Sequence, residues 1–123
     1  MKFSQQRRIA AAVVAATAEK LPSEIRELAR AVPVLLQDRP DESVLAEGFP
    51  ADLLGLFSGT SYGEEVGQLA PEPPYIILYL NNLWDYAATD ETVFRAEVRR
   101  TYLHELGHHL GWNEDQLAAR GLD

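Results

Sequence analysis

The sequence predicts an α+β fold, in which a small mixed sheet of three to four strands packs on one long helix and on helices near the N-terminus. Three patterns lead to this prediction. Residues 75–80 are apolar without interruption, which is typical of a central strand covered on both faces. Residues 89–110 combine helical periodicity with terminal signals, and residues 3–32 contain two further helical patterns. At 123 residues the chain is expected to form one domain over 1–123.

The N-terminal part is predicted to be helical. Residues 3–20 form an alanine-rich helical pattern. Pro22 suits the first turn of a second helix, which Pro33 ends. The basic residues and the apolar run of residues 9–16 imitate an export signal. However, the run is short, is mostly alanine and continues as helix through Glu19 and Lys20, so we expect the protein to remain in the cytoplasm.

The middle of the chain alternates short strands with turns. Residues 34–36 are expected to form a strand, and residues 41–47 a turn of helix. Residues 53–57 are a second strand candidate, in which Gly55 indicates a bulge or a close backbone approach.

A long loop follows over residues 58–74, which are rich in glycine and proline, with a hairpin tip near residues 61–63. A loop of this length is either functional or simply variable surface. After the strand at residues 75–80, Asn81 and Asn82 are expected to end it, and Trp84 and Tyr86 to lie in a connection.

The long helix is predicted to run from Thr89-Asp90-Glu91, which place a capping residue and acidic groups at its start, to about Leu110. Gly111 suits the left-handed residue that ends a helix. One face is apolar and packs on the domain. The other face looks into a cleft. The apolar set is Ala96, Val98, Tyr102, Leu103, Leu106 and Leu110, and the cleft set is Val93, Glu97, Arg100, Thr101, His104 and His108.

The end of this helix carries the pattern His-Glu-x-x-His. His104 and His108 are four residues apart and therefore point the same way on a helix, where two imidazoles bind one Zn²⁺. Glu105 reaches the edge of the same site and is expected to act as a base. His109 is turned by about 140° from His104, so it is interpreted as a packing or hydrogen-bonding residue.

Composition narrows the choice of ligands and partners. The chain has no cysteine, so a metal must be held by histidine, aspartate or glutamate, and the absence of thiols fits a reducing cytosol. A net charge of −8 argues against nucleic acid and anionic membranes as partners. No apolar run has the length of a membrane span.

A third metal ligand is expected soon after Gly111, because only a short tail follows His108. If Gly111 turns the chain back, Glu114 returns under the metal, and the spacing then copies the metzincin pattern with a carboxylate as the third ligand. Asp115 is the alternative ligand, and a site with no third protein ligand stays open. The only methionine is Met1, so the methionine turn of a metzincin is absent. A last helix is predicted at residues 116–120, capped by residues 113–115.

These residues give the chain a resemblance to a known family. Residues 97–101 leading into 104–111, followed by acids, look like the small bacterial zincin-like metallopeptidases, or minimal zincins; residues 53–57 and 75–80 are also similar. The resemblance implies a compact α+β fold with a small sheet on the metal helix and a peptidase activity. Trp112-Asn113-Glu114 departs from the denser acidic run of many relatives.

The predicted function is a zinc-dependent peptidase that hydrolyses a peptide or protein substrate through a metal-bound water, with Glu105 as general base. Residues 54–57 are the candidate edge strand for the substrate. Glu97 and Thr101 are candidates to orient the histidines, although a solvated ion pair of Glu97 with Arg100 is an equal alternative. Tyr62 and Tyr75 are available as further donors. The alternative functions are a non-catalytic, zinc-stabilised interaction domain and a metal-free helical binding module.

Overall fold

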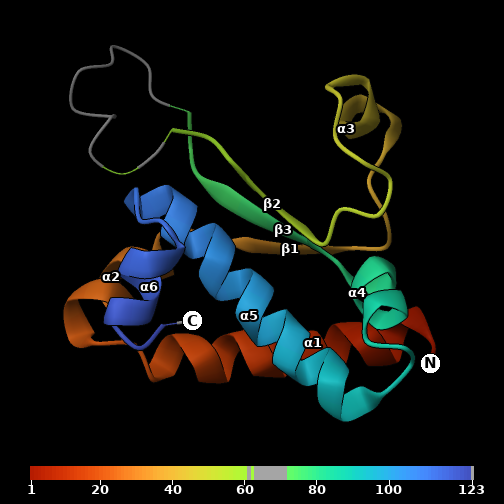
Figure 1. The fold of residues 1–123 in the computed structure, drawn as a ribbon, viewed down its shortest axis with the longest axis horizontal. Helices are drawn as coiled ribbons and strands as arrows, with labels where there is room; N and C mark the ends of the chain where they lie inside the picture. The colour runs from red at the N-terminus through yellow and green to blue at the C-terminus, as the bar shows by residue number, and fades with distance from the viewer. Residues whose placement is uncertain (61, 63–71, 123) are drawn as a thin grey trace.

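The structure, a computed structural model, describes residues 1–60, 62 and 72–122. The elements follow the order α1 (Phe3–Glu19), α2 (Ser23–Arg30), β1 (Val34–Gln37), α3 (Glu42–Ala46), β2 (Gly55–Ser58), β3 (Tyr75–Tyr79), α4 (Leu80–Tyr86), α5 (Glu91–Leu110) and α6 (Glu114–Ala119). The α+β fold with a small mixed sheet, a long C-terminal helix and N-terminal helices is therefore confirmed (Figure 1).

The sheet has three strands in the order β1-β3-β2. β1 runs parallel to β3, whereas β2 runs antiparallel to it, with Gly55 opposite Leu78. Residues 76–79 are all buried, although alternate side chains point to opposite faces. β3 is therefore central and buried, as predicted, but only Ile76 and Leu78 belong to the core beneath the helices, while Ile77 and Tyr79 are buried outside it. β2 is an edge strand beside α5.

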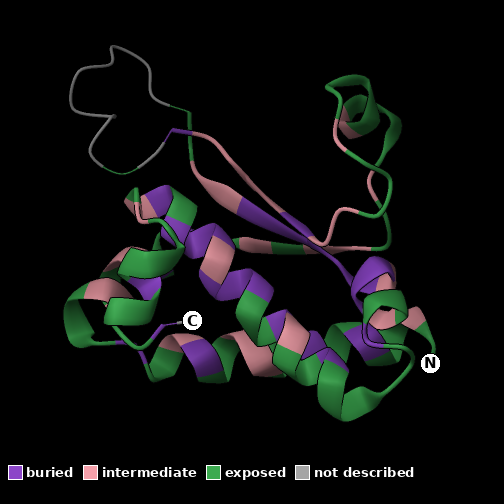
Figure 2. Cartoon of the chain, viewed as in Figure 1, coloured by how far each residue is buried: buried purple, intermediate pink, exposed green. Residues whose placement is uncertain are grey.

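One helical layer covers the sheet. α1 and α5 pack against each other, and α5 also contacts β2 and β3 (Figure 1). Figure 2 shows that buried residues of α5 recur along its whole length. Burying apolar area of this kind is the main favourable contribution to folding, at roughly 25 cal/mol per Å². The core joins α1, α2, β3, α4, α5 and α6, and its largest fully buried apolar side chains include Ile76, Leu78, Leu80, Leu83, Phe94 and Val98.

The ends of α5 form as the sequence predicts. The side chain of Asp90 accepts a hydrogen bond from the backbone N–H of Val93 at 3.0 Å. At the other end Gly111 is left-handed, with φ 75°, and the backbone N–H of Trp112 donates to the carbonyl of Gly107 at 2.8 Å. These two caps fix where the helix starts and stops, and therefore where His104 and His108 lie.

The main error of the prediction concerns residues 80–86, which form α4 instead of a connection containing Trp84 and Tyr86. Leu80 opens this helix directly after β3. Asn81 and Asn82 do not act as turn residues. Their side chains hydrogen-bond to distant segments and do not compete for the backbone groups of their own segment, so these groups remain available for the hydrogen bonds of a helix.

Smaller differences concern element boundaries and burial. The second strand begins at Gly55 and not at residue 53, and the last helix begins at Glu114, with Asn113 as its cap. Ala96, placed in the apolar arc, is exposed, and the core position belongs to Phe94, whose ring lies 5.5 Å from that of Trp84. The hairpin tip predicted near residues 61–63 lies outside the described residues, apart from Tyr62. No helix in the described part of the chain has both the length and the apolar character needed to cross a bilayer.

Candidate metal centre

The two histidines of the motif meet on one side of α5. The ring centroids of His104 and His108 are 4.5 Å apart, and the donor atoms of His104, Glu105 and His108 all lie within 4.8 Å of one another. Both side chains are partly exposed, with 39% and 50% of the side chain accessible. The helical spacing therefore brings together the three residues that the motif predicts.

Glu105 is held more tightly than its neighbours, since it is only 6% exposed. Its Oε1 accepts a hydrogen bond from the backbone N–H of Phe57 at 3.0 Å and lies 3.3 Å from Nδ1 of His108. Its Oε2 lies 3.9 Å from Nε2 of His104. The carboxylate is thus fixed by β2 and faces both imidazoles.

The bond from Phe57 follows from the register of β2. Leu54 accepts a bond from the N–H of Tyr79 across the ladder, so Gly55 and Phe57 point their backbone groups away from β3. This outward edge faces α5. The candidate edge strand for a substrate is therefore present, but the outward N–H of Phe57 is already used by Glu105.

Gly55 explains how β2 comes so close to α5. A Cβ atom at this position would lie 2.6 Å from Cγ2 of Thr101, 3.2 Å from the carbonyl oxygen of Ile77 and 3.4 Å from Cγ of Glu105. The contact of 2.6 Å is strongly repulsive and that of 3.2 Å is tight, so only glycine fits without movement. The close backbone approach predicted at Gly55 is confirmed.

Gly107 and Gly111 bring the tail back toward the histidines. A Cβ at Gly107 would lie 2.8 Å from Cδ1 of Leu117, so α6 packs directly over this glycine. Glu114, in the first turn of α6, contacts Nδ1 of His104 through Oε1. Asp115 makes no ion pair or hydrogen bond to a histidine within the described residues. Glu114, and not Asp115, therefore contacts His104, although it is not one of the three residues whose donor atoms lie within 4.8 Å of one another.

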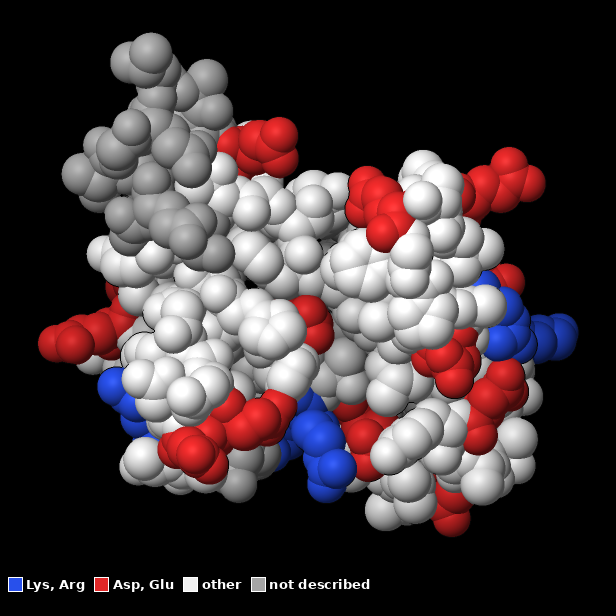
Figure 3. All heavy atoms as spheres, turned by 45° about the horizontal axis from the view of Figure 1, so that its top comes forward, with Lys and Arg blue, Asp and Glu red and all other residues white. Residues whose placement is uncertain are grey.

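A cleft of about 600 Å³ opens beside these groups, which is within the range of ligand pockets. Its lining includes residues of β2 and of the segment before it, of α5 and of α6: Leu53, Leu54, Gly55, His104, Glu105 and Glu114. On the face shown in Figure 3 the surface is hollowed near its middle, and acidic and basic side chains lie in and beside the hollow. The cleft is lined by the carboxylates of Glu97, Glu105 and Glu114 and by the guanidinium of Arg100, so its charge suits a cation better than an anion.

His109 is predicted to be a packing or hydrogen-bonding residue. It is buried, and its ring lies 5.3 Å from that of Phe57, which agrees with a packing role.

Glu97 and Thr101 are the predicted candidates to orient the histidines. Oε1 of Glu97 lies 3.9 Å from Nη1 of Arg100, and Thr101 packs against Gly55. Neither residue hydrogen-bonds to a histidine among the described residues. The backbone N–H of Tyr62 donates to the carbonyl of His109 at 2.8 Å.

Two contacts of the site could not be read from the motif. The bond from Phe57 joins a backbone N–H to the side chain of a residue 48 positions away, and no pattern in the sequence indicates it. The wall formed by Leu53 and Leu54 is the other. A glycine next to two leucines was the available signal, because it showed that the backbone comes close to another element there.

The donor set fits a divalent transition metal. Two neutral imidazoles with nearby carboxylates are the ligands that zinc takes in the absence of thiolates. The histidines also lie in the last two turns of α5, where the partial negative charge of the helix end favours a cation. The residues present therefore match the group that the motif implies.

Comparison with known protein families agrees with a zinc site of this kind. The family model of the zincin-like metallopeptidases matches residues 29–122, which include β1 to β3, α4 to α6 and the whole centre described above. The chain belongs to the zincin-like metallopeptidase family. Among curated proteins, no match to the chain is found.

Proposed function

We propose that the protein is a zinc-dependent peptidase, in which His104, His108 and Glu114 hold the metal and Glu105 is the general base. The observation that carries this proposal is the position of Glu105. Its carboxylate is buried, is fixed by the N–H of Phe57, and lies between the two imidazoles at the side of an open cleft. A carboxylate that served only as a surface charge would not need this support.

A bound zinc ion would supply Lewis-acid polarisation of the substrate carbonyl and of the attacking water. Glu105 accepts the proton of that water through one carboxylate oxygen as the new carbon–oxygen bond forms. It then delivers the proton to the amide nitrogen as the carbon–nitrogen bond breaks. The N–H of Phe57 keeps the carboxylate aimed at the cleft during both transfers.

The substrate is a peptide or a protein, and it lies in the cleft between Leu54 and Glu114. The negative net charge supports neither nucleic acid nor an anionic membrane as the target. The absence of cysteine supports action in the cytoplasm.

A pair of substitutions in α5 tests this proposal. His104→Ala should lose stoichiometric zinc, because it removes a ligand. Glu105→Gln should keep the zinc and lose about 10²–10⁴-fold in peptide cleavage, because the amide cannot accept the proton. Metal analysis of the purified protein and digestion of a mixed peptide library measure the two effects. Glu91→Gln, at the exposed start of α5, is the control and should change neither. A wild-type protein without stoichiometric zinc would contradict the proposal.

One observation favours a second function, a zinc-stabilised interaction domain. Both oxygens of Glu105 face imidazole nitrogens, so Glu105 is itself close enough to be a ligand. A centre closed by His104, His108, Glu105 and Glu114 would leave no open position for chemistry. In that case Glu105→Gln would weaken zinc binding, and the wild type would cleave no peptide.

A further inference from the structure

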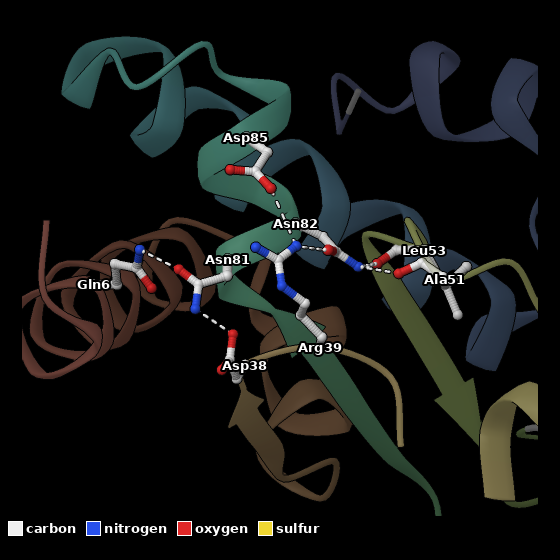
Figure 4. Close-up of polar contacts among 8 residues, drawn as sticks. All are labelled: Gln6, Asp38, Arg39, Ala51, Leu53, Asn81, Asn82 and Asp85. Atoms are coloured by element: carbon white, nitrogen blue, oxygen red, sulfur yellow. Dashed lines mark hydrogen bonds and ion pairs between the residues drawn. The ribbon is translucent and has the colours of Figure 1, made fainter. Parts of the chain in front are cut away.

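Asn82 is a buried polar residue that the catalytic proposal does not use. It lies in the first turn of α4 and is only 4% exposed. Its Nδ2 donates two hydrogen bonds, each of 2.8 Å, to the carbonyl oxygens of Ala51 and Leu53 (Figure 4). A buried amide that donates both of its N–H groups to one neighbouring segment fixes the position of that segment.

The orientation of this amide is set from the other side. Nη1 of Arg39 donates to Oδ1 of Asn82 at 2.6 Å and also to Oδ2 of Asp85 at 3.1 Å (Figure 4). Arg39 has no acceptor, so its partner atom on Asn82 must be the oxygen. The amide group therefore has to face Ala51 and Leu53 with its two N–H donors.

The segment held by Asn82 has few other backbone hydrogen bonds. Residues 51–54 belong to no helix or strand. The backbone bonds within and beside the segment are a turn from the N–H of Leu53 to the carbonyl of Pro50 at 3.3 Å, and the bond from Tyr79 to Leu54 at 3.0 Å. The two bonds from Asn82 supply partners to carbonyls that secondary structure does not satisfy.

The same segment borders two hollows. Leu53 and Leu54 line the catalytic cleft together with Glu105. A second hollow of about 470 Å³ has Ala51, Leu54 and Asn82 in its lining. Leu54 packs against the core, whereas Leu53 does not belong to it. The hydrogen bond from Asn82 is therefore the direct connection between the backbone of Leu53 and α4.

We propose that Asn82 is a positioning residue that fixes the Leu53–Leu54 wall, and that this wall selects substrates with a large apolar side chain next to the scissile bond. This proposal rests on the proposed peptidase function. The two leucines present apolar surface to the cleft, and burying a leucine-sized side chain against them favours binding. That gain depends on close contact, which a mobile wall cannot provide.

The neighbouring Asn81 provides a matched control within the same helix. It has the same side chain and also bridges distant segments, because it accepts a bond from Gln6 at 2.8 Å and donates to Asp38 (Figure 4). Gln6 belongs to α1 and Asp38 directly follows β1, and neither of them lines the cleft. A loss of stability alone should therefore appear in both variants, whereas a change in the wall should appear only at Asn82.

The first test needs no turnover. Hydrogen exchange of the amides in residues 51–56 is measured in the wild type, Asn82→Ala, Asn82→Asp and Asn81→Ala. We expect exchange at least tenfold faster in both Asn82 variants and unchanged in Asn81→Ala. Asn82→Asp keeps the volume of the side chain and loses the donors, so it separates the hydrogen bonds from a cavity. Equal exchange in the Asn81 and Asn82 variants would overturn the positioning role.

The second test uses two model peptides that differ only in leucine or aspartate after the cleaved bond. For Asn82→Ala we expect KM for the leucine peptide to rise about tenfold with little change in kcat, and the preference for leucine to fall by a similar factor. Asn81→Ala should keep the wild-type preference. An unchanged preference in Asn82→Ala would overturn the specificity. A wild type that cleaves neither peptide would overturn the proposed function, and the exchange experiment would still decide the positioning role.

Discussion

The cleft has one wall on the β2 side and one on the α6 side, and they differ in how firmly they are held. On the β2 side, Gly55 packs directly on α5, the N–H of Phe57 holds Glu105, and Asn82 holds the segment before the strand. On the α6 side, Glu114 belongs to a helix of 6 residues, and its side chain is 70% exposed. The proposed base is thus held by the β2 wall, whereas the third ligand candidate is an exposed side chain on a short helix.

This difference suits the two tasks. Proton transfer needs a carboxylate held to within a few tenths of an ångström, which a buried group with a hydrogen bond from a strand provides. A metal ligand can move into place, because the ion itself draws the carboxylate in when it binds. The following substitutions test the comparison, from the largest expected effect to the smallest.

Removing the ligand candidate of the α6 wall should have the largest effect. Glu114→Ala should lower zinc affinity on the order of 100-fold, at the upper end of what supporting groups contribute, while folding stability without metal stays the same. Isothermal titration with zinc and thermal unfolding in chelator measure the two quantities. Asp115→Ala is the control, because it removes an equal charge one residue away. If Asp115→Ala gives the larger loss, the third ligand is Asp115.

Adding a methyl group to the firm wall should cost stability. In Gly55→Ala the new Cβ would meet Cγ2 of Thr101 and the backbone of Ile77, so β2 or α5 must shift, at about 1–3 kcal/mol of unfolding free energy. Urea denaturation measures this loss. Ser58→Ala, in the same strand, serves as the control and should differ little from the wild type. A fully stable Gly55→Ala would show that the β2 wall is not tightly packed.

The same change on the other wall should be milder. In Gly107→Ala the nearest atoms to the new Cβ would be Cδ1, Cδ2 and Cγ of Leu117, which belong to a side chain and not to backbone and can shift together with α6. Alanine also favours a helix over glycine by up to about 1 kcal/mol, so the net change in stability should be close to zero. We expect zinc affinity to fall a few-fold, because the added methyl group displaces α6 and with it Glu114. Isothermal titration with zinc measures this loss. A loss of stability as large as that of Gly55→Ala would contradict the comparison.

The sequence predicts well what depends on neighbours along the chain. The caps at Asp90 and Gly111 and the common direction of His104 and His108 follow from local helical geometry. The central strand follows from an apolar run that only a covered position tolerates. These features required no knowledge of the tertiary structure.

What the sequence does not predict depends on residues that are distant along the chain. Asn81 and Asn82 have the composition of a turn, and their actual partners lie between 29 and 75 positions away. Since those partners are not visible in the sequence, the helix from Leu80 to Tyr86 could not be distinguished from a connecting loop by sequence alone. The bond from Phe57 to Glu105 is of the same kind, because it depends on the register of β2 against β3.

The contact between His104 and Glu114 has a consequence for the C-terminal tail. A helix of 6 residues has little stability of its own, and α6 depends on its packing over Gly107. An ion shared by α5 and α6 would join them as a crosslink does, and it would lower the rate at which the tail frays and is clipped by proteases. Cellular zinc supply would then set not only how much of the protein carries the metal but also how long each molecule survives.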